Sequence, residues 1–151
     1  MDNQIMKSVR LPKALVDAVE QRAEVLGLTF ADLVEAGLRQ EVGMKPNPRT
    51  QLLKDLALLV MGLYPKRTGF PPEVTLLIVR AMRADSALVG MYDVAIRNAK
   101  GRVDEGLKAV LHRQIGQMVK RVLGATVIGR SNPLDPAVEL IKTHALLVPG
   151  P

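Results

Sequence analysis

The sequence predicts a mostly helical protein with two parts, a small N-terminal module at residues 1–45 and an all-helical domain at residues 46–151. Apolar residues alternate with polar ones around Val9, as in a strand, and from Lys13 they recur every three or four residues, as in helices. One glycine and two prolines fall within residues 43–48, a composition typical of a linker. We therefore expect one strand and two helices before the linker and a second domain after it.

The expected strand is short and has one apolar face. Val9 and Leu11 alternate with Ser8 and Arg10, and Pro12, which has no backbone N–H to donate, closes the pattern. A single strand leaves its backbone donors and acceptors unpaired, so we expect it to need a second strand.

Two amphipathic helices follow the strand. The first is expected over Lys13–Leu26, with Gly27 in the left-handed conformation that commonly ends a helix. The second is expected over residues 30–42, with Thr29 as its N-cap and Asp32 three residues later in a capping box. The strand and helices together are too short to close a hydrophobic core, because small domains bury too little of their surface. We therefore expect the module to dimerise.

In such a dimer the two strands would pair antiparallel as a ribbon over four helices, and a two-stranded ribbon fits the major groove of DNA. The module resembles the ribbon-helix-helix DNA-binding proteins of the MetJ/Arc type. The resemblance lies in the run Val-Arg-Leu-Pro-Lys-Ala-Leu at 9–15, the turn Leu-Gly-Leu-Thr at 26–29 and the run Leu-Val-Glu-Ala-Gly-Leu-Arg at 33–39. It covers about the first third of the chain.

The resemblance implies that outward-facing strand side chains read base edges, and that backbone N–H groups at the start of the second helix hold a phosphate. By position, the base-reading residues are Met6, Ser8 and Arg10, with Gln4 extending the set. The phosphate-anchoring residues are Thr29 and Phe30.

Lys7 departs from the family pattern. On this register it falls on the inner face with Val9 and Leu11, where the family places an apolar side chain. Either the ordered ribbon begins near Lys7, whose stem can reach out past the edge, or a bulge turns Ile5 inward. The ammonium group of Lys7 is also a candidate phosphate contact.

The net charge of +6 favours an acidic partner such as nucleic acid, but the charge is unevenly distributed. Residues 1–45 contain six Lys or Arg against seven Asp or Glu, whereas the rest of the chain contains fifteen against eight. Basic residues gather around one long predicted helix: Arg97, Lys100, Arg102, Lys108, Arg113, Lys120 and Arg121. We expect most of these to be solvated, with Lys120 and Arg121 as candidates for extra phosphate contacts.

The second part shows helical periodicity almost throughout. Its most regular apolar stripe follows Asp104, a candidate N-cap, and stops at Gly124. Other helices are expected over residues 49–64, 73–82, 88–99 and 135–147, while residues 126–128 are too few to assign. We expect this domain to serve oligomerisation or partner binding.

Patterns for catalysis or metal binding are missing from the sequence. There is no cysteine, which excludes disulfides, thiolate metal sites and thiol catalysis. His112 and His144 lie far apart, and no phosphate-binding loop or nucleophile elbow is present. We therefore expect a non-enzymatic protein without cofactor or metal. The N-terminus lacks a secretion signal and no apolar run approaches the ~20 residues of a membrane span, which predicts a cytoplasmic protein without a membrane partner.

These expectations combine into a dimeric protein that binds double-stranded DNA sequence-specifically. Two uses remain open. An accessory factor in plasmid DNA processing, conjugative transfer or partition would also dock a DNA-processing enzyme, whereas a transcriptional repressor would need only the dimer and an operator. The alternative is a protein-interaction scaffold or an antitoxin-like module that dimerises without reading DNA, and the near-neutral charge of residues 1–45 keeps it open.

Overall fold

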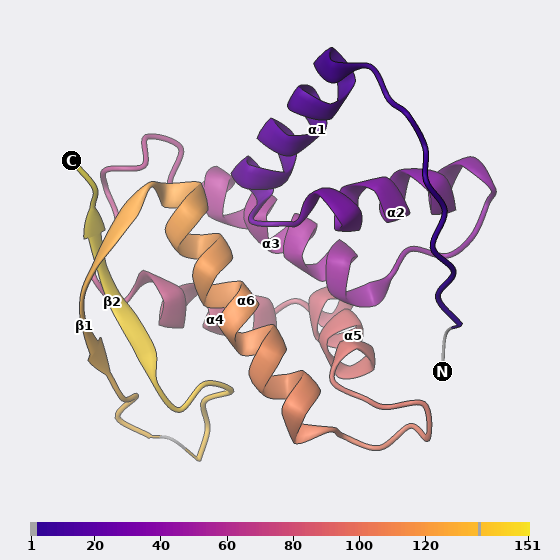
Figure 1. Cartoon of the computed structure of the whole chain (residues 1–151). Coiled ribbons are helices and arrows are strands. Elements are labelled where there is room, and N and C mark those ends of the chain that lie inside the picture. Colours follow the sequence, from indigo (N-terminus) through magenta and orange to yellow (C-terminus); the bar gives the residue numbers. More distant parts are fainter. Residues whose placement is uncertain (1–2, 136) are drawn as a thin grey trace.

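The computed structural model describes residues 3–135 and 137–151, and Figure 1 shows their arrangement. Within these residues the elements are α1 (Lys13–Leu26), α2 (Phe30–Glu41), α3 (Pro48–Leu63), α4 (Val74–Arg83), α5 (Ser86–Ala95), α6 (Glu105–Leu123), β1 (Ala125–Ser131) and β2 (His144–Pro149). The predicted mostly helical class is therefore confirmed.

Local capping signals set the helix ends where the sequence predicts them. Gly27 ends α1 with a φ of 69°. At the start of α2 the backbone N–H of Thr29 donates to the carboxylate of Asp32, and the N–H of Asp32 donates to the Thr29 hydroxyl, which completes the capping box. The Asp104 side chain caps α6, and Gly124 ends that helix with a φ of 59°.

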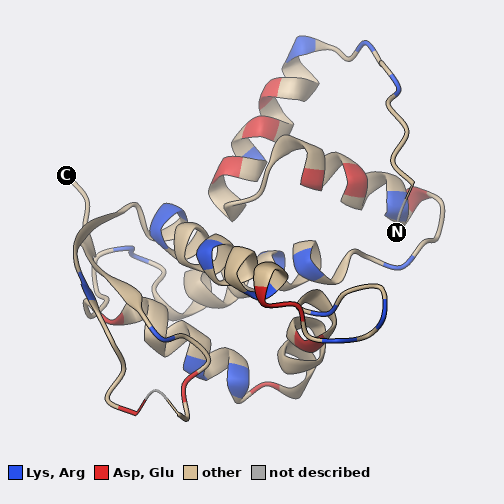
Figure 2. Ribbon diagram, turned by 60° about the horizontal axis from the view of Figure 1, so that its bottom comes forward, with Lys and Arg blue, Asp and Glu red and all other residues tan. Residues whose placement is uncertain are grey.

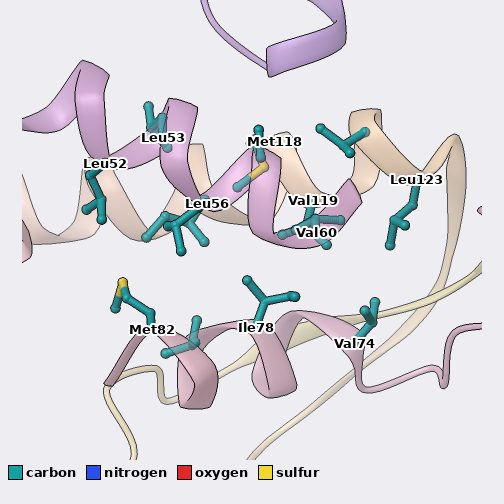
Figure 3. Packing of buried hydrophobic residues seen from close by; sticks show 14 of the residues in the cluster. Leu52, Leu53, Leu56, Val60, Val74, Ile78, Met82, Met118, Val119 and Leu123 are labelled. Atoms are coloured by element: carbon teal, nitrogen blue, oxygen red, sulfur yellow. The ribbon is translucent and has the colours of Figure 1, made fainter. Parts of the chain in front are cut away.

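The core lies between α3, α4 and α6 (Figure 3). Leu56 and Val60 of α3, Ile78 of α4, and Met118 and Val119 of α6 are all buried in it. Burying one such side chain stabilises a fold by roughly 1.5–3 kcal/mol, so these three helices hold the second part of the chain together. α5 covers the core from another side and adds Leu88 and Tyr92.

The second part is not all-helical, which corrects the prediction. β1 and β2 pair as a two-stranded antiparallel sheet. The helix predicted over residues 135–147 is wrong, because its last residues form β2; Pro136, in its expected first turn, lies outside the described residues. The Leu147 N–H donates to the Pro72 carbonyl oxygen at 3.0 Å. Such bonds between segments distant in the sequence leave no mark on local periodicity, so apolar spacing suggested a helix instead.

Residues 3–12 form neither helix nor strand in the single chain, so the strand predicted around Val9 is not formed there. A strand requires backbone hydrogen bonds to a neighbouring strand, and β1 and β2 lie in the second part of the chain. The N-terminal segment lies beside the end of α2 and leads from there to the start of α1 (Figure 1).

The α1–α2 hairpin packs against α6 through a small contact. Within residues 3–42 the buried side chains are those of Ala23, Leu26 and Leu28. A Cβ atom added to Gly27 would lie 2.7 Å from the Cα atom of Met118 on α6. Gly27 therefore serves two purposes, a left-handed helix end and a close approach between the hairpin and α6.

We expect Gly27→Ala to lower the free energy of unfolding by at least about 2 kcal/mol, because alanine disfavours the left-handed conformation and its Cβ would overlap Met118. Gly90→Ala is the control, since Gly90 lies within α5 and nothing lies within 4 Å of an added Cβ there. That change should raise the free energy of unfolding by about 0.5–1 kcal/mol. Urea unfolding followed by circular dichroism measures both, and equal effects would contradict the close contact.

Candidate nucleic-acid interface

The predicted base-reading residues lie in an exposed segment outside the core. Met6 is 94% exposed, and Gln4, Ser8 and Arg10 are exposed as well. Lys7 is exposed in the same segment. The structure therefore brings this predicted set together on one stretch of chain that is accessible to a partner.

Apolar residues of the same module are exposed to an unusual degree. Val9 is 75% exposed, Leu15 on α1 is 49% exposed and Leu38 on α2 is 63% exposed. The amphipathic α2 contains no buried residue at all. In a monomeric soluble protein, gathered apolar side chains of this kind mark an interaction site.

Leu15 and Leu38 line a groove of about 560 Å³ between α1 and α2. Its apolar lining comes from Leu11, Leu15, Val16, Ala18, Val19, Leu26, Phe30, Leu33, Val34, Ala36 and Leu38. Lys54 of α3 also reaches the groove. The stripes on α1 and α2 follow from the sequence pattern, but the position of Lys54 does not, because it depends on how the α1–α2 hairpin packs against α3.

The two predicted phosphate-anchoring groups differ in the structure. The Thr29 N–H donates to Asp32 Oδ2 at 3.1 Å, and Arg49 Nη2 lies 3.5 Å from Asp32 Oδ1. A phosphate at Thr29 would therefore have to displace a carboxylate of like charge. The Phe30 N–H makes no hydrogen bond to any described residue. Phe30 is thus the better placed of the two for an anion.

Charge is separated within the module. The segment before α1 and the start of α1 carry Lys7, Arg10 and Lys13, whereas acidic side chains gather on α1 and α2 (Figure 2). The near-neutral total therefore conceals a basic segment beside an acidic hairpin. The basic part is the one that contains the predicted base-reading residues.

Lys120 and Arg121 lie away from that segment. Both are exposed near the end of α6, where they line a shallow groove with Glu24 and Val25 at the far end of α1. A helix rises 1.5 Å per residue, so Glu24 is roughly 16 Å along α1 from its first residue. Within one chain the structure therefore does not bring Lys120 and Arg121 together with Arg10.

Comparison with family models, with curated proteins and with solved structures found no match. Among the described residues no helix is both long and apolar enough to cross a membrane. A search of the same residues found no group of three or more His, Asp or Glu side chains arranged to hold a metal ion.

We expect the full chain to sediment as a dimer and the double variant Leu15→Glu/Leu38→Glu to sediment as a monomer, because a buried unpaired carboxylate costs several kcal/mol. Both side chains are exposed in the single chain, so its helical circular dichroism should be retained. Leu58→Glu, at a similarly exposed leucine on α3, is the control and should leave the dimer intact. A wild-type monomer at micromolar concentrations would contradict the groove as a dimer interface.

Proposed function

We propose that the chain is a dimeric ribbon-helix-helix protein that binds double-stranded DNA in a sequence-specific way. In the dimer, residues 3–12 of two copies pair as an antiparallel ribbon, and the ribbon covers the groove between α1 and α2. The observation that carries this proposal is the state of the module in a single chain: an unpaired N-terminal segment stands beside an amphipathic α2 with no buried residue.

A second copy would provide hydrogen-bond partners for the N-terminal segment and an apolar partner for α2. Pairing two N-terminal segments provides the backbone hydrogen bonds that one copy cannot make alone. Alternation then turns Val9 and Leu11 toward the groove and Ser8 and Arg10 away from it. The interface is the same patch on both subunits, as two-fold symmetry requires.

The outward face of the ribbon is the DNA-reading surface. Arg10 is its strongest member, since a guanidinium can make two parallel hydrogen bonds to a guanine edge in the major groove. Ser8 and Met6 lie on the same face and supply one hydrogen bond and apolar contact. The N–H of Phe30 at the start of α2 fixes the register on a phosphate, aided by the partial positive charge of the helix N-terminus.

The second part of the chain favours an accessory role in plasmid DNA processing, transfer or partition over a simple antitoxin. Residues 48–149 supply most of the hydrophobic core, to which the N-terminal module adds Leu26 and Leu28, so this part is more than a short tail for binding a toxin. A folded domain of this size offers a docking surface for a DNA-processing enzyme. A transcriptional repressor with the same dimer remains the second use.

We expect Arg10→Ala to weaken binding to a duplex selected from a random pool by about tenfold or more, since one bidentate base contact contributes about 1–3 kcal/mol. Discrimination against scrambled duplexes should fall with it. The contrast is Lys120→Ala/Arg121→Ala. If those residues touch phosphates, that variant should weaken binding to all duplexes alike and reduce the salt dependence by about one unit per lost contact.

Binding titrations at several salt concentrations, with dimer formation checked by sedimentation, distinguish the outcomes. Unchanged discrimination in Arg10→Ala would remove Arg10 as a reader. A wild-type dimer that binds all duplexes alike would favour the hypothesis that the module is a protein-interaction scaffold.

A further inference from the structure

A third concave site lies away from the N-terminal segment, on the part of the molecule that carries the β1–β2 sheet. It is a cavity of about 710 Å³ bounded by α6, by α4, by the β1–β2 sheet and by the loop that joins the two strands. Small-molecule sites in proteins commonly have volumes of about 300–1,000 Å³. One face of α6 lines it, since the lining residues of that helix include a series at steps of three or four positions: Glu105, Lys108, His112, Gly116 and Lys120.

The inner wall of the cavity is apolar. Its accessible apolar lining comes from Val127 of β1, Leu140 of the connecting loop and Ala145 of β2. Val79 of α4, Ile115 of α6 and Leu147 of β2 also line it but are almost completely buried. No Phe, Tyr or Trp is among the lining residues, so the cavity offers no aromatic platform on which a base could stack. The wall therefore suits an aliphatic body better than a nucleobase.

The rim of the cavity is strongly basic. Five Lys or Arg side chains line it against one acidic residue, Glu105: Lys108, Arg113, Lys120, Arg130 and Lys142. They come from α6, β1 and the connecting loop, so the fold and not a run of sequence brings them together. None of the five forms an ion pair with any described residue, whereas nearby Arg80 pairs with Glu139 at 2.8 Å. Five positive charges around one cavity with one acidic side chain among them repel one another, and an anion relieves that repulsion.

Both histidines of the chain also line this cavity. Burial lowers the pKa of His112 and of His144 below the ordinary value of 6.5, so both rings are neutral at pH 7. His112 is held by a 2.7 Å hydrogen bond to the Tyr92 hydroxyl, and burial raises the pKa of Tyr92 to about 12, so the phenol stays neutral. At neutral pH the positive charge of the cavity therefore comes from Lys and Arg alone.

Two buried polar groups stand in the same wall. His144 is 4% exposed, and neither of its ring nitrogens has a hydrogen-bond partner among the described residues; the buried hydroxyl of Thr75 has none either. A buried polar group without a partner is destabilising. Less than 1 Å² of each atom is exposed, so these atoms lie behind the cavity surface and reach a ligand only after a side-chain rotation.

We propose that this cavity binds a small organic anion in which a phosphate or carboxylate group is joined to an aliphatic body. The basic rim holds the anionic group through charge-assisted hydrogen bonds, and the accessible apolar lining on β1, β2 and the connecting loop holds the body. A DNA duplex fits the cavity less well, because its phosphates form an outer ridge that cannot reach the apolar wall. The site lies outside residues 1–45 and does not require DNA binding, although Lys120 on its rim is also a candidate DNA phosphate contact.

The test uses n-octyl phosphate as the probe and the full chain, with isothermal titration for affinity and amide ¹H–¹⁵N shifts for location. We expect octyl phosphate to bind at least about tenfold more tightly than octan-1-ol, which lacks the charge. The shifted amides should lie on α6, β1 and residues 140–147. Equal binding of octan-1-ol, or shifts confined to the groove between α1 and α2, would overturn the proposal.

Two variants test the two halves of the site. Arg113→Gln/Arg130→Gln should weaken binding by at least about tenfold, whereas the control Arg97→Gln/Arg102→Gln removes the same charge outside the cavity and should have a much smaller effect. Gly116→Leu should block binding by filling the cavity, since nothing lies within 4 Å of an added Cβ and leucine is the better helix former. Gly90→Leu on α5 is its control.

Equal weakening by the two arginine pairs would show that only net charge acts, and undiminished binding to Gly116→Leu would place the ligand elsewhere. A short DNA duplex that displaces octyl phosphate from the wild-type chain would identify the rim as a nucleic-acid contact. Each of these results would overturn the proposal.

Discussion

The structure depends on the burial of one face of α6. This helix contacts α1, α3, α4, α5 and both strands, and its buried side chains include Leu111, Ile115, Met118 and Val122. At 1.5 Å per residue a helix of this length extends about 28 Å, enough to reach all of these elements. The core, the hairpin and the anion cavity all contact α6. This one helix therefore fixes their positions relative to one another.

The N-terminal hairpin shows the opposite balance between burial and exposure. It rests on α6 and α3 through three buried side chains and the close approach at Gly27, while the larger apolar area of α1 and α2 faces outward. A helix pair whose apolar face was buried against its own chain could not dimerise through that face. The small inner contact therefore positions the hairpin and leaves its apolar face exposed for the proposed dimer.

The sequence predicts most of the fold because most of its elements carry local signals. Gly27, Thr29, Asp104 and Gly124 act at single helix ends, through φ preference or a side-chain hydrogen bond, and they need no knowledge of the rest of the chain. The sheet is different. Residues 137–147 contain good helix formers at helical spacing, and only pairing with β1 makes their last part a strand. Sequence patterns cannot register a partner that lies about twenty residues away.

The same limit separates the two candidate sites. The predicted base-reading set follows from the family resemblance of one short stretch of sequence, and the apolar stripes that line the groove follow from helical periodicity within residues 13–42. The anion cavity forms where α6 meets β1 and the loop before β2. Because the sequence did not predict the sheet, it could not predict the cavity. The sequence shows the excess of basic residues in the second part, and this excess suggested phosphate contacts at Lys120 and Arg121. In the folded chain these neighbours divide: Lys120 lines the cavity with Arg113 and Arg130, whereas Arg121 does not. Which ligand a basic side chain can contact thus depends on whether the fold places it in a cavity or on a convex surface.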